Sequence, residues 1–425
     1  MRKSFYVRTS LILFCVLAFG ECSDKCNVTT TYTYFVPIYS TSAEVKQAVQ
    51  FEEARPIKSP GRIYFKDQFL YINEAGEGIH VINNQNPASP THVGFLKIPG
   101  NHELAIAGDM LYADSFVDLV VFDVSDKSSI HEVNRIEQVF DHTFWYGFAS
   151  MANNLVLTGW KPISTISVQE SECEDRRMLW GGIMYDAGIA MPSASFASTG
   201  GSPSTGVGGS LSRFTISSNT LYGLDGAYLD IVDVTQPESP RSIKEINTGW
   251  DVETLFPYKD KLFAGSRTGM YIYDLNNPNA PSLVSKYQHV MSCDPVVVND
   301  NYAYVTLRTG NSCRGGVNQL EVINIANLSS PQVVKTFPMT NPYGLGIDNT
   351  TLFICDGDAG LKVFDASDVM QIDKHQLKSF PNIKPVDIVP FQNIAMVIAS
   401  DGLYQYDYSD KENIHQVSKL VIAAQ

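Results

Sequence analysis

The stretch from Leu262 to Pro281, LFAGSRTGMYIYDLNNPNAP, decides the fold. It contains an apolar segment, a turn with glycine, a second apolar segment that ends in Asp274, and an Asn/Pro-rich turn. Short apolar segments bounded by Gly, Pro and Asn are typical of β-strands joined by tight turns. The same pattern recurs along the chain, so its number and spacing define the architecture.

Seven copies of this pattern can be aligned on the strand that Leu262 begins. Most steps between copies are 41 to 49 residues, as from Leu221 to Leu262 and from Ala303 to Leu352. With about four short strands per unit and no helix signal, this period predicts an all-β fold, a β-propeller with four-stranded antiparallel blades. The second strands of the seven units begin at Leu70, Leu111, Leu221, Leu262, Ala303, Leu352 and Ala395, and the third strands at Ile79, Leu119, Leu229, Met270, Leu320, Leu361 and Leu403.

Each third strand ends in Asn or Asp. Such a side chain can accept a hydrogen bond from the backbone about two residues further on and so start a turn. We therefore interpret these residues as turn formers and not as a set of catalytic carboxylates. They are Asn83, Asp123, Asp233, Asp274, Asn324, Asp365 and Asp407.

One step is far too long, because 110 residues separate Leu111 from Leu221. A degenerate eighth blade over 147–168 would fill part of this gap. We favour seven blades over 61–422 with an irregular excursion at 134–210. The stretch ASFASTGGSPSTGVGGS (194–210) lacks the Gly-Lys-Ser/Thr ending of a phosphate-binding loop, so we interpret it as a mobile linker.

The N-terminus has the features of an export signal over 1–21. A basic region with Arg2, Lys3 and Arg8 precedes the apolar run 11–19, which is too short to span a bilayer. Cleavage after Gly20 would release the chain, whereas a lipid on Cys22 would anchor it. Residues 22–60 form an N-terminal tether, in which a capping box at 41–44 predicts a short helix over 43–50.

Composition limits the partners. The formal net charge is -14 and the pI about 5.0, so no basic surface is expected for binding nucleic acid. Six cysteines lie beyond the signal core, and an exported protein can form disulfides. Up-and-down alternation places Cys293 and Cys313 on one face of the same unit, which predicts a disulfide between them, and Cys355 is expected to be a buried strand residue.

A candidate site lies where the inner strands begin. The loop into each inner strand and the loop between the second and third strands should open on one face, the mouth of the central channel. Polar residues recur there, with Arg62 and Arg213 as candidate anion contacts. The alternative is a purely structural role, in which these residues form a ring of water-bridged ion pairs. The candidate ligand-binding residues are Arg62, His102, Glu103, Arg213, Glu253, Asp294 and Asp387.

No cofactor, metal site or catalytic residue is expected from the sequence. Asp356-Gly357-Asp358 offers two obvious oxygen ligands where calcium needs six to eight, so a tight hairpin is favoured there.

The stretches LDIVDVTQPESP, LVVFDVSDKSS and LKVFDASD resemble the LVIVD-repeat proteins. With CSDKC, TYTYFVPIY and GWDVETLFPYKDKLF, the chain is similar to exported lipoproteins of Bacteroidetes-type bacteria. The resemblance implies a propeller in the bacterial cell envelope, an outer-membrane lipoprotein that meets the membrane only through its lipid. It implies no enzymatic activity.

The leading hypothesis is a binding or scaffold protein without catalysis that uses the channel-mouth face for a ligand, or for an unknown protein or polysaccharide partner. The competing hypothesis is a propeller hydrolase or lyase acting on extracellular glycans or small esters. Its one weak hint is His102 beside Glu103.

Overall fold

The structure is a computed structural model that describes residues 25–142, 155–172, 196–197, 205–249, 251–289, 295–309 and 317–422. These residues belong to two compact units. One contains 25–38 and 159–172, and the other contains the remaining described residues. The larger unit is all-β.

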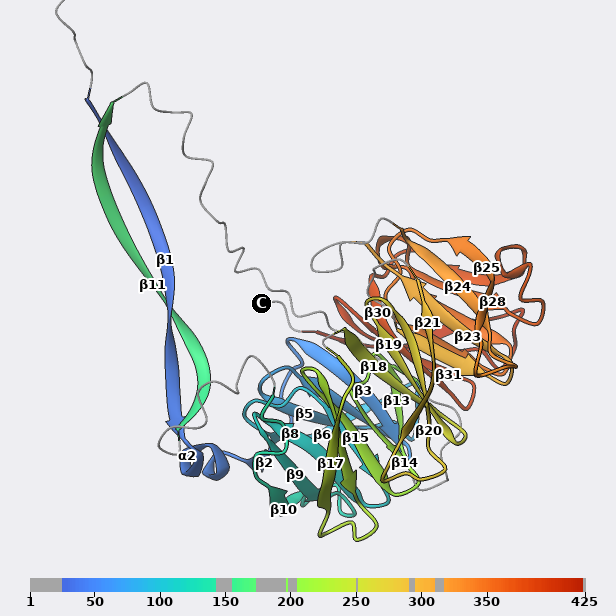
Figure 1. Cartoon of the computed structure of the whole chain (residues 1–425), viewed down its shortest axis with the longest axis horizontal. Helices are drawn as coiled ribbons and strands as arrows, with labels where there is room; N and C mark the ends of the chain where they lie inside the picture. The colour runs from blue at the N-terminus through green and yellow to red at the C-terminus, as the bar shows by residue number, and fades with distance from the viewer. Residues whose placement is uncertain are drawn as a thin grey trace, which may run out of the picture. The chain divides into compact units, whose positions relative to one another are not determined.

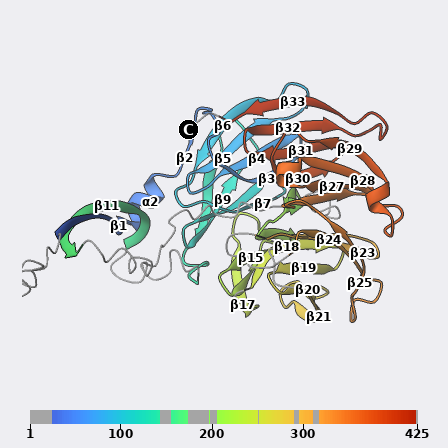
Figure 2. The ribbon, with the colours of Figure 1, turned by 90° about the horizontal axis from the view of Figure 1, so that it is seen from above.

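The larger unit is a ring of seven four-stranded antiparallel sheets (Figure 1; Figure 2). The predicted fold class and the preferred blade number are thereby confirmed. In chain order the blades are β3 (Pro60–Lys66), β4 (Phe69–Glu74), β5 (Gly78–Asn83) and β6 (Thr91–Lys97); β7 (Leu104–Ala107), β8 (Met110–Ser115), β9 (Asp118–Asp123) and β10 (His131–Ile136); β14 (Phe214–Ser217), β15 (Thr220–Asp225), β16 (Tyr228–Asp233) and β17 (Arg241–Asn247); β18 (Val252–Tyr258), β19 (Lys261–Ser266), β20 (Gly269–Asp274) and β21 (Ser282–Gln288); β22 (Val296–Asn299), β23 (Tyr302–Leu307), β24 (Gln319–Asn324) and β25 (Gln332–Pro338); β26 (Leu345–Asp348), β27 (Thr351–Cys355), β28 (Leu361–Asp365) and β29 (Gln376–Phe380); and β30 (Pro385–Phe391), β31 (Ile394–Ala399), β32 (Gly402–Asp407) and β33 (His415–Val421).

The seven Asn and Asp residues that end the third strands form the predicted turns. In each case the side-chain oxygen accepts a hydrogen bond from the backbone N–H two residues on, at 2.7 Å from Asn276 to Asp274 and 2.9 Å from Gln85 to Asn83. The remaining five acceptors are Asp123, Asp233, Asn324, Asp365 and Asp407. These carboxylate and amide side chains hold the turns, which confirms their structural role.

Aromatic side chains on the second strands fill the core between blades. Tyr112 and Tyr222 are fully buried, and each hydroxyl finds a partner in the following blade. Tyr112 donates to the carbonyl of Pro237 at 3.2 Å, and Tyr222 donates to that of Pro278 at 2.8 Å. Because a buried phenol needs a hydrogen-bond partner, these contacts fix the spacing of neighbouring blades as well as burying the rings.

The ring closes without a shared strand, since the first and last blades are each continuous in sequence. They lie side by side in Figure 2, in blue and red. Phe65 of β3 packs on Phe391 of β30 with ring centroids 5.1 Å apart, inside a mixed apolar cluster from both blades. Asn84 and Gln405 add a buried pair of hydrogen bonds across the same junction.

The long step in the sequence is an insertion into the loop that leads into the third blade. In the first and sixth blades, Glu74 and Asp356 accept backbone N–H bonds from this lead-in loop, as in the 2.9 Å bond from Thr340 to Asp356. Asp225 is the corresponding residue of the third blade, and its carboxylate accepts from the backbone N–H of His142 at 2.6 Å. His142 therefore occupies the position of a lead-in residue of the third blade, and the insertion lies beyond it in the sequence.

The alternative of an eighth blade over 147–168 is wrong. β11 (Leu155–Glu172) pairs with β1 (Lys25–Thr41) in a separate two-stranded ribbon, so it joins no blade. Its backbone partner comes from the N-terminal tether, a pairing across more than a hundred residues that a local repeat pattern does not reveal.

The returning end of the excursion plugs the channel. β13 (Val207–Ser210) pairs antiparallel with the inner strand β3 and parallel with β12 (Phe196–Ala197). Residues 206–212 also form hydrogen bonds with the inner strands of three more blades. Gly206 N–H donates to Ile106 O at 2.9 Å, Leu255 N–H donates to Ser212 O at 2.8 Å, and Leu345 N–H donates to Ser210 Oγ at 3.2 Å. The interpretation of 194–210 as a mobile linker is therefore wrong for 196–197 and 205–210.

Glycine is required in this plug by close approach to an aromatic ring. A Cβ on Gly206 would lie 2.3 Å from the Tyr64 ring, and one on Gly208 would lie 2.8 Å from it. The Gly-rich composition thus permits a strand to lie flat against Tyr64 inside the ring.

The tether contains a helix and a strand besides β1. Helix α2 (Ser42–Gln47) begins with the predicted capping box, in which Thr41 Oγ1 accepts from Glu44 N at 3.2 Å and Glu44 accepts from Thr41 N at 2.7 Å. β2 (Gln50–Glu52) then adds to the outer edge of the first blade through β6. Two short 3-10 turns, η1 (Gly357–Ala359) and η2 (Ile372–Lys374), lie in the sixth blade. Among the described residues, no helix is long and apolar enough to cross a membrane.

Candidate functional site: an arginine cluster at the channel mouth

Glu103, just before the inner strand of the second blade, connects this blade to the first and third blades. Its Oε1 accepts from Arg62 Nε at 2.7 Å and Nη2 at 2.6 Å, and its Oε2 accepts from the backbone N–H of Arg213 at 3.1 Å. Arg62 lies on β3, Glu103 directly precedes β7, and Arg213 directly precedes β14. The structure thus brings together three residues that the sequence placed at equivalent positions of different repeats.

Asp114 positions Glu103 through hydrogen bonds to the backbone of its loop. This buried carboxylate accepts the backbone N–H groups of His102 and Glu103 at 2.8 and 2.7 Å and the side-chain amide of Asn101 at 2.8 Å. Burial raises the pKa of Asp114 to about 7, although the backbone N–H bonds oppose the rise. Asp114 therefore fixes the loop that carries Glu103. Asp114 was not among the candidate residues that the sequence predicted at the channel mouth.

Arg213 has one buried donor without a hydrogen-bond partner among the described residues. Its Nη2 donates to the carbonyl oxygen of Leu224 at 3.1 Å. Its Nε is buried and has no hydrogen-bond partner among the described residues. A buried guanidinium donor without a partner is energetically costly.

Glu253 and Arg267 form the solvent-facing end of the cluster. Arg267 Nε donates to Glu253 Oε1 at 2.8 Å, with the side chains 40% and 28% exposed, against 13% for Arg62 and 6% for Glu103. Burial raises the pKa of Glu253, and the positive charges of Arg267, Arg213 and Arg308 oppose that rise. The cluster therefore contains one mostly buried ion pair, Arg62–Glu103, and one more exposed ion pair, Arg267–Glu253.

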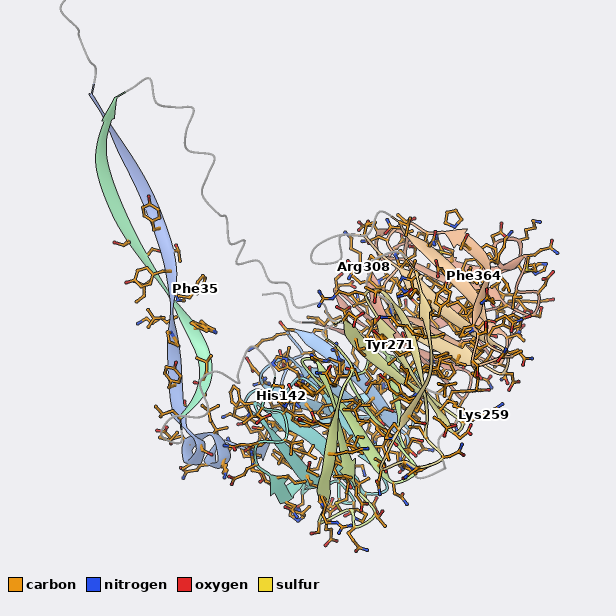
Figure 3. The ribbon with its side chains drawn as sticks, viewed as in Figure 1. Phe35, His142, Lys259, Tyr271, Arg308 and Phe364 are labelled. Carbon is orange, nitrogen blue, oxygen red and sulfur yellow. The ribbon has the colours of Figure 1, made fainter. Side chains whose placement is uncertain are left out.

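Arg308 is held by an aromatic ring. Its guanidinium carbon lies 4.1 Å from the centroid of the Tyr343 ring, a cation–π contact, and the residue is labelled in Figure 3. We call Arg62, His102, Glu103, Arg213, Glu253, Arg267 and Arg308 the arginine cluster.

His102 is poorly suited to act as a general base together with Glu103. Burial, together with the charges of Arg62 and Arg213, lowers the pKa of His102 to about 4, so the imidazole is neutral at neutral pH. Both oxygens of Glu103 already accept hydrogen bonds. The pair therefore does not form the general-base arrangement that a hydrolase needs.

Other predicted residues lie elsewhere. Asp387 is buried on β30 beside Cys355, whose thiol pKa is raised by burial and by the nearby carboxylates. Cys355 is the buried strand residue that the sequence predicted. Asp294, the predicted disulfide between Cys293 and Cys313 and the predicted lipidation site Cys22 lie outside the described residues.

The Asp356-Gly357-Asp358 segment lies in the predicted hairpin, between the antiparallel strands β27 and β28, and its loop contains the 3-10 turn η1. Asp356 accepts two backbone N–H groups and pairs with Lys362 at 2.6 Å, so its oxygens are used within the blade. In the described part of the chain, no group of three or more His, Cys, Asp or Glu side chains is arranged to hold a metal ion.

Two arginines of the cluster were missed at the sequence level. Arg267 and Arg308 each stand five residues after their second-strand start, in the matching segments SRTG and LRTG. Both segments belong to second-to-third-strand loops, which share the channel-mouth face with the lead-in loops. The repeated Arg-Thr-Gly was the signal that would have found them.

Comparisons with known proteins support the architecture. The LVIVD repeat family matches residues 101–137 and 292–338. No curated protein matches the chain. Among solved structures, a protein from Lactobacillus plantarum has a TM-score of 0.54 at 12% identity, covering 86% of this chain and 97% of that one.

Two further solved structures are similar in fold. The computationally designed Ika8 protein has a TM-score of 0.52 at 8% identity, with 88% of this chain and 91% of that chain covered. Sqt1 of Saccharomyces cerevisiae has a TM-score of 0.50 at 7% identity, with 88% and 87% covered. At such identities the likeness concerns the fold alone. The chain thus contains two segments that match the LVIVD repeat, and its fold is a seven-bladed β-propeller.

Proposed function

We propose that the protein is an exported, lipid-anchored binding protein that takes an anionic group of a ligand or partner into the arginine cluster, without catalysis. The observation that carries this proposal is Arg213, whose Nε is buried without a hydrogen-bond partner among the described residues. A guanidinium fork suits carboxylate, sulfate and phosphate oxygens, which it can bind through two parallel hydrogen bonds.

The charge balance of the cluster favours an anion. It holds four guanidinium groups, at Arg62, Arg213, Arg267 and Arg308, and two carboxylates. His102 adds no charge at neutral pH because its pKa is lowered to about 4, chiefly by burial. These residues thus carry a surplus of two positive charges, next to the buried Asp114, whose pKa is raised to about 7. The site is partly desolvated, and ion pairing there is stronger than in water.

The rest of the chain limits the kind of anion. The formal net charge of -14 makes most of the protein repel a long polyanion. A small anion, or a single anionic group at the end of a sugar chain or peptide, would meet the cluster without lying along the acidic surface. We therefore expect a short acidic glycan or a terminal carboxylate as the ligand.

Citrate and a short oligogalacturonate are suitable probes, tested by isothermal titration calorimetry. Arg213→Met should weaken their binding by about tenfold or more, the usual effect of losing a charge-assisted hydrogen bond. The matched control is Arg241→Met on β17, which removes the same charge from a side chain that is 73% exposed. Equal affinities of wild type and Arg213→Met would refute the proposal.

Export and anchoring rest on the N-terminal sequence. The basic region, the apolar run 11–19 and Cys22 followed by Ser-Asp-Lys support a lipidated mature N-terminus. Cell fractionation of the Cys22→Ala variant tests it. The variant should move from the membrane to the soluble exported fraction, and its continued recovery with the membrane would contradict lipidation.

A further inference from the structure

Four carboxylates gather on one face of the third blade, and none of them belongs to the arginine cluster. Asp230 on β16 lies directly opposite Glu245 of β17, and Asp225 ends the neighbouring strand β15. Asp141 follows β10 of the second blade, and its charge acts on Asp230 together with those of Asp225 and Glu245. We call Asp141, Asp225, Asp230 and Glu245 the acidic group. Like charges this close favour the binding of a cation or a proton.

Asp230 is the buried member without a partner. Its side chain belongs to a residue that is 5% exposed, and its Oδ2 has no hydrogen-bond partner among the described residues. Its neighbour on β15 is Gly223, where a Cβ would lie 3.0 Å from the rings of both Phe140 and Phe214. These rings form an apolar wall on that side, so the polar surroundings of Asp230 lie towards Glu245.

His142 balances only part of the negative charge. Its Nε2 lies 2.7 Å from Glu245 Oε2 and 3.4 Å from Asp141 Oδ1, and its ring stacks on Tyr228 with centroids 4.0 Å apart (Figure 3, where His142 is labelled). Burial lowers the pKa of His142, but the bond with Glu245 and the nearby carboxylates outweigh burial and raise it. These contacts involve Glu245 and Asp141 and not Asp230, and one imidazolium cannot balance four carboxylates.

A proton holds Asp230 in its neutral form. Burial, and then the charges of Asp225, Glu245 and Asp141, raise the pKa of Asp230 to about 8, so the carboxyl group is mostly protonated at neutral pH. A cation beside Asp230 would offset these negative charges and favour the ionised form. Such a cation therefore has to displace the proton when it binds.

The geometry favours an ammonium group over a metal ion. Within the part of the chain that the structure describes, no three His, Cys, Asp or Glu side chains are arranged to hold a metal. A primary ammonium needs fewer acceptors, since it has three N–H donors. The exposed fraction of the side chains falls from 50% at Glu245 and 34% at Asp141 to the buried Asp230. A narrow alkyl chain can carry an ammonium along this path, whereas a branched quaternary ammonium is wider and has no donor.

We propose that the acidic group is a second ligand site, which binds the primary alkylammonium group of a small amine. The ammonium donates to Asp230 and to Glu245 Oε1, the oxygen that His142 does not bind, and Asp141 lies at the entrance. The Asp230 proton passes to solvent as the ammonium binds, so charge and protons balance. The inference does not depend on the arginine cluster, which differs from this site in its residues and in the sign of its charge.

Isothermal titration calorimetry with putrescine at pH 7 tests the proposal. Asp230→Asn should weaken binding by about tenfold or more, because the ammonium loses a charge-assisted hydrogen bond. Asp373→Asn removes an exposed carboxylate elsewhere and should leave the affinity unchanged. Tetramethylammonium, which has no N–H donor, should bind wild type far more weakly than putrescine. A melting temperature of Asp230→Asn at or above that of wild type shows that the variant is folded.

Proton release separates this site from general attraction of cations to an acidic surface. Titrations in buffers of different ionisation enthalpy should show about one proton released per putrescine by wild type at pH 7, and none by Asp230→Asn. The affinity of wild type should therefore rise from pH 6 to pH 8. Nα-acetyl-lysinamide carries the same ammonium on a peptide unit, and weaker binding than putrescine would assign the site to small amines.

Three results would overturn the proposal. The first is equal affinity of wild type and Asp230→Asn for putrescine, and the second is binding without proton release. The third is calcium binding that Asp230→Asn abolishes and that excludes putrescine, since the ligand would then be a metal ion.

Discussion

Asn84 and Gln405 are 321 residues apart in the chain and exchange two hydrogen bonds in the protein interior. Asn84 Nδ2 donates to Gln405 Oε1 at 2.9 Å, and Gln405 Nε2 donates to Asn84 Oδ1 at 2.7 Å and to the carbonyl of Pro87 at 3.2 Å. Asn84 directly follows β5 of the first blade, and Gln405 lies on β32 of the last. Since no strand is shared between these blades, this amide pair and the surrounding apolar cluster close the ring.

Replacing Gln405 by Met should therefore destabilise the whole ring. Met keeps the length of the side chain but leaves the Asn84 amide buried without its partner, which costs about 1–3 kcal/mol in the free energy of unfolding. Urea denaturation followed by far-UV circular dichroism measures the loss. Gln332→Met, at an exposed position on β25, is the control and should change stability by less than about 0.5 kcal/mol.

The reciprocal pair also predicts non-additivity. Asn84→Leu combined with Gln405→Met should cost less than the sum of the two single changes, because each single change leaves a buried amide that the double change removes. Strict additivity would show that the two residues do not act as a pair.

The channel plug predicts that Gly206 tolerates no side chain. Its Cβ would lie 2.3 Å from the Tyr64 ring and 2.9 Å from the carbonyl of Phe65, so Gly206→Ala should destabilise the protein by about 1–3 kcal/mol. Gly159→Ala is the matched control, because its Cβ would meet nothing closer than 4.0 Å. Thermal unfolding compares the two, and similar melting temperatures would mean that residues 205–210 do not occupy the channel.

The sequence predicted those parts of the fold that are encoded by short patterns within each repeat. Strand positions and turns follow from short patterns, so the seven blades and the seven turn-forming Asn and Asp residues could be placed in advance. The same offset logic brought Arg62, Glu103 and Arg213 to one face. Each of these features depends on neighbours within one unit or on equivalence between units.

Long-range features escaped prediction for a physical reason. The Asn84–Gln405 pair, the seating of β13 on Tyr64 and the pairing of β1 with β11 depend on contacts between distant segments, which leave no period in the sequence. Gly-rich composition was misleading at β13, since glycine there permits close packing and does not indicate mobility. Arg267 lies in the stretch from Leu262 to Pro281, and Arg308 occupies the equivalent position of the next repeat. The sequence analysis did not identify this equivalence.

Asp230 predicts a pH-dependent contribution to stability. It is buried on β16 opposite Glu245 of β17, with an Oδ2 that lacks a hydrogen-bond partner among the described residues. Burial, and then the charges of Asp225, Glu245 and Asp141, raise its pKa to about 8. An unfolded Asp has a pKa near 3.9, so the folded state holds a proton that the unfolded state releases.

This stabilisation is present below about pH 4 and is lost as the pH rises towards 8. Asp230→Asn cannot ionise, so its melting temperature should exceed that of wild type by an amount that grows from pH 5 to pH 9. Asp373→Asn, at an exposed position, should show no such trend. A constant difference between Asp230→Asn and wild type would contradict the assignment.

The cysteines predict a simple labelling pattern. Cys355 is buried, and burial raises its thiol pKa, so it should resist iodoacetamide in the folded protein and react only after denaturation. Peptide mapping without reductant also tests the Cys293–Cys313 disulfide, which stays a prediction. Recovery of both residues as free thiols from exported protein would rule that bridge out.

The central claim, that the arginine cluster is an anion site, is tested most directly by a crystal structure soaked with selenate, located by its anomalous signal. The account predicts a selenate oxygen within hydrogen-bond distance of Arg213 Nε, and no such peak in the Arg213→Met variant. No anion at Arg213, or a divalent metal bound by Glu103 and Glu253 in a parallel metal soak, would contradict it.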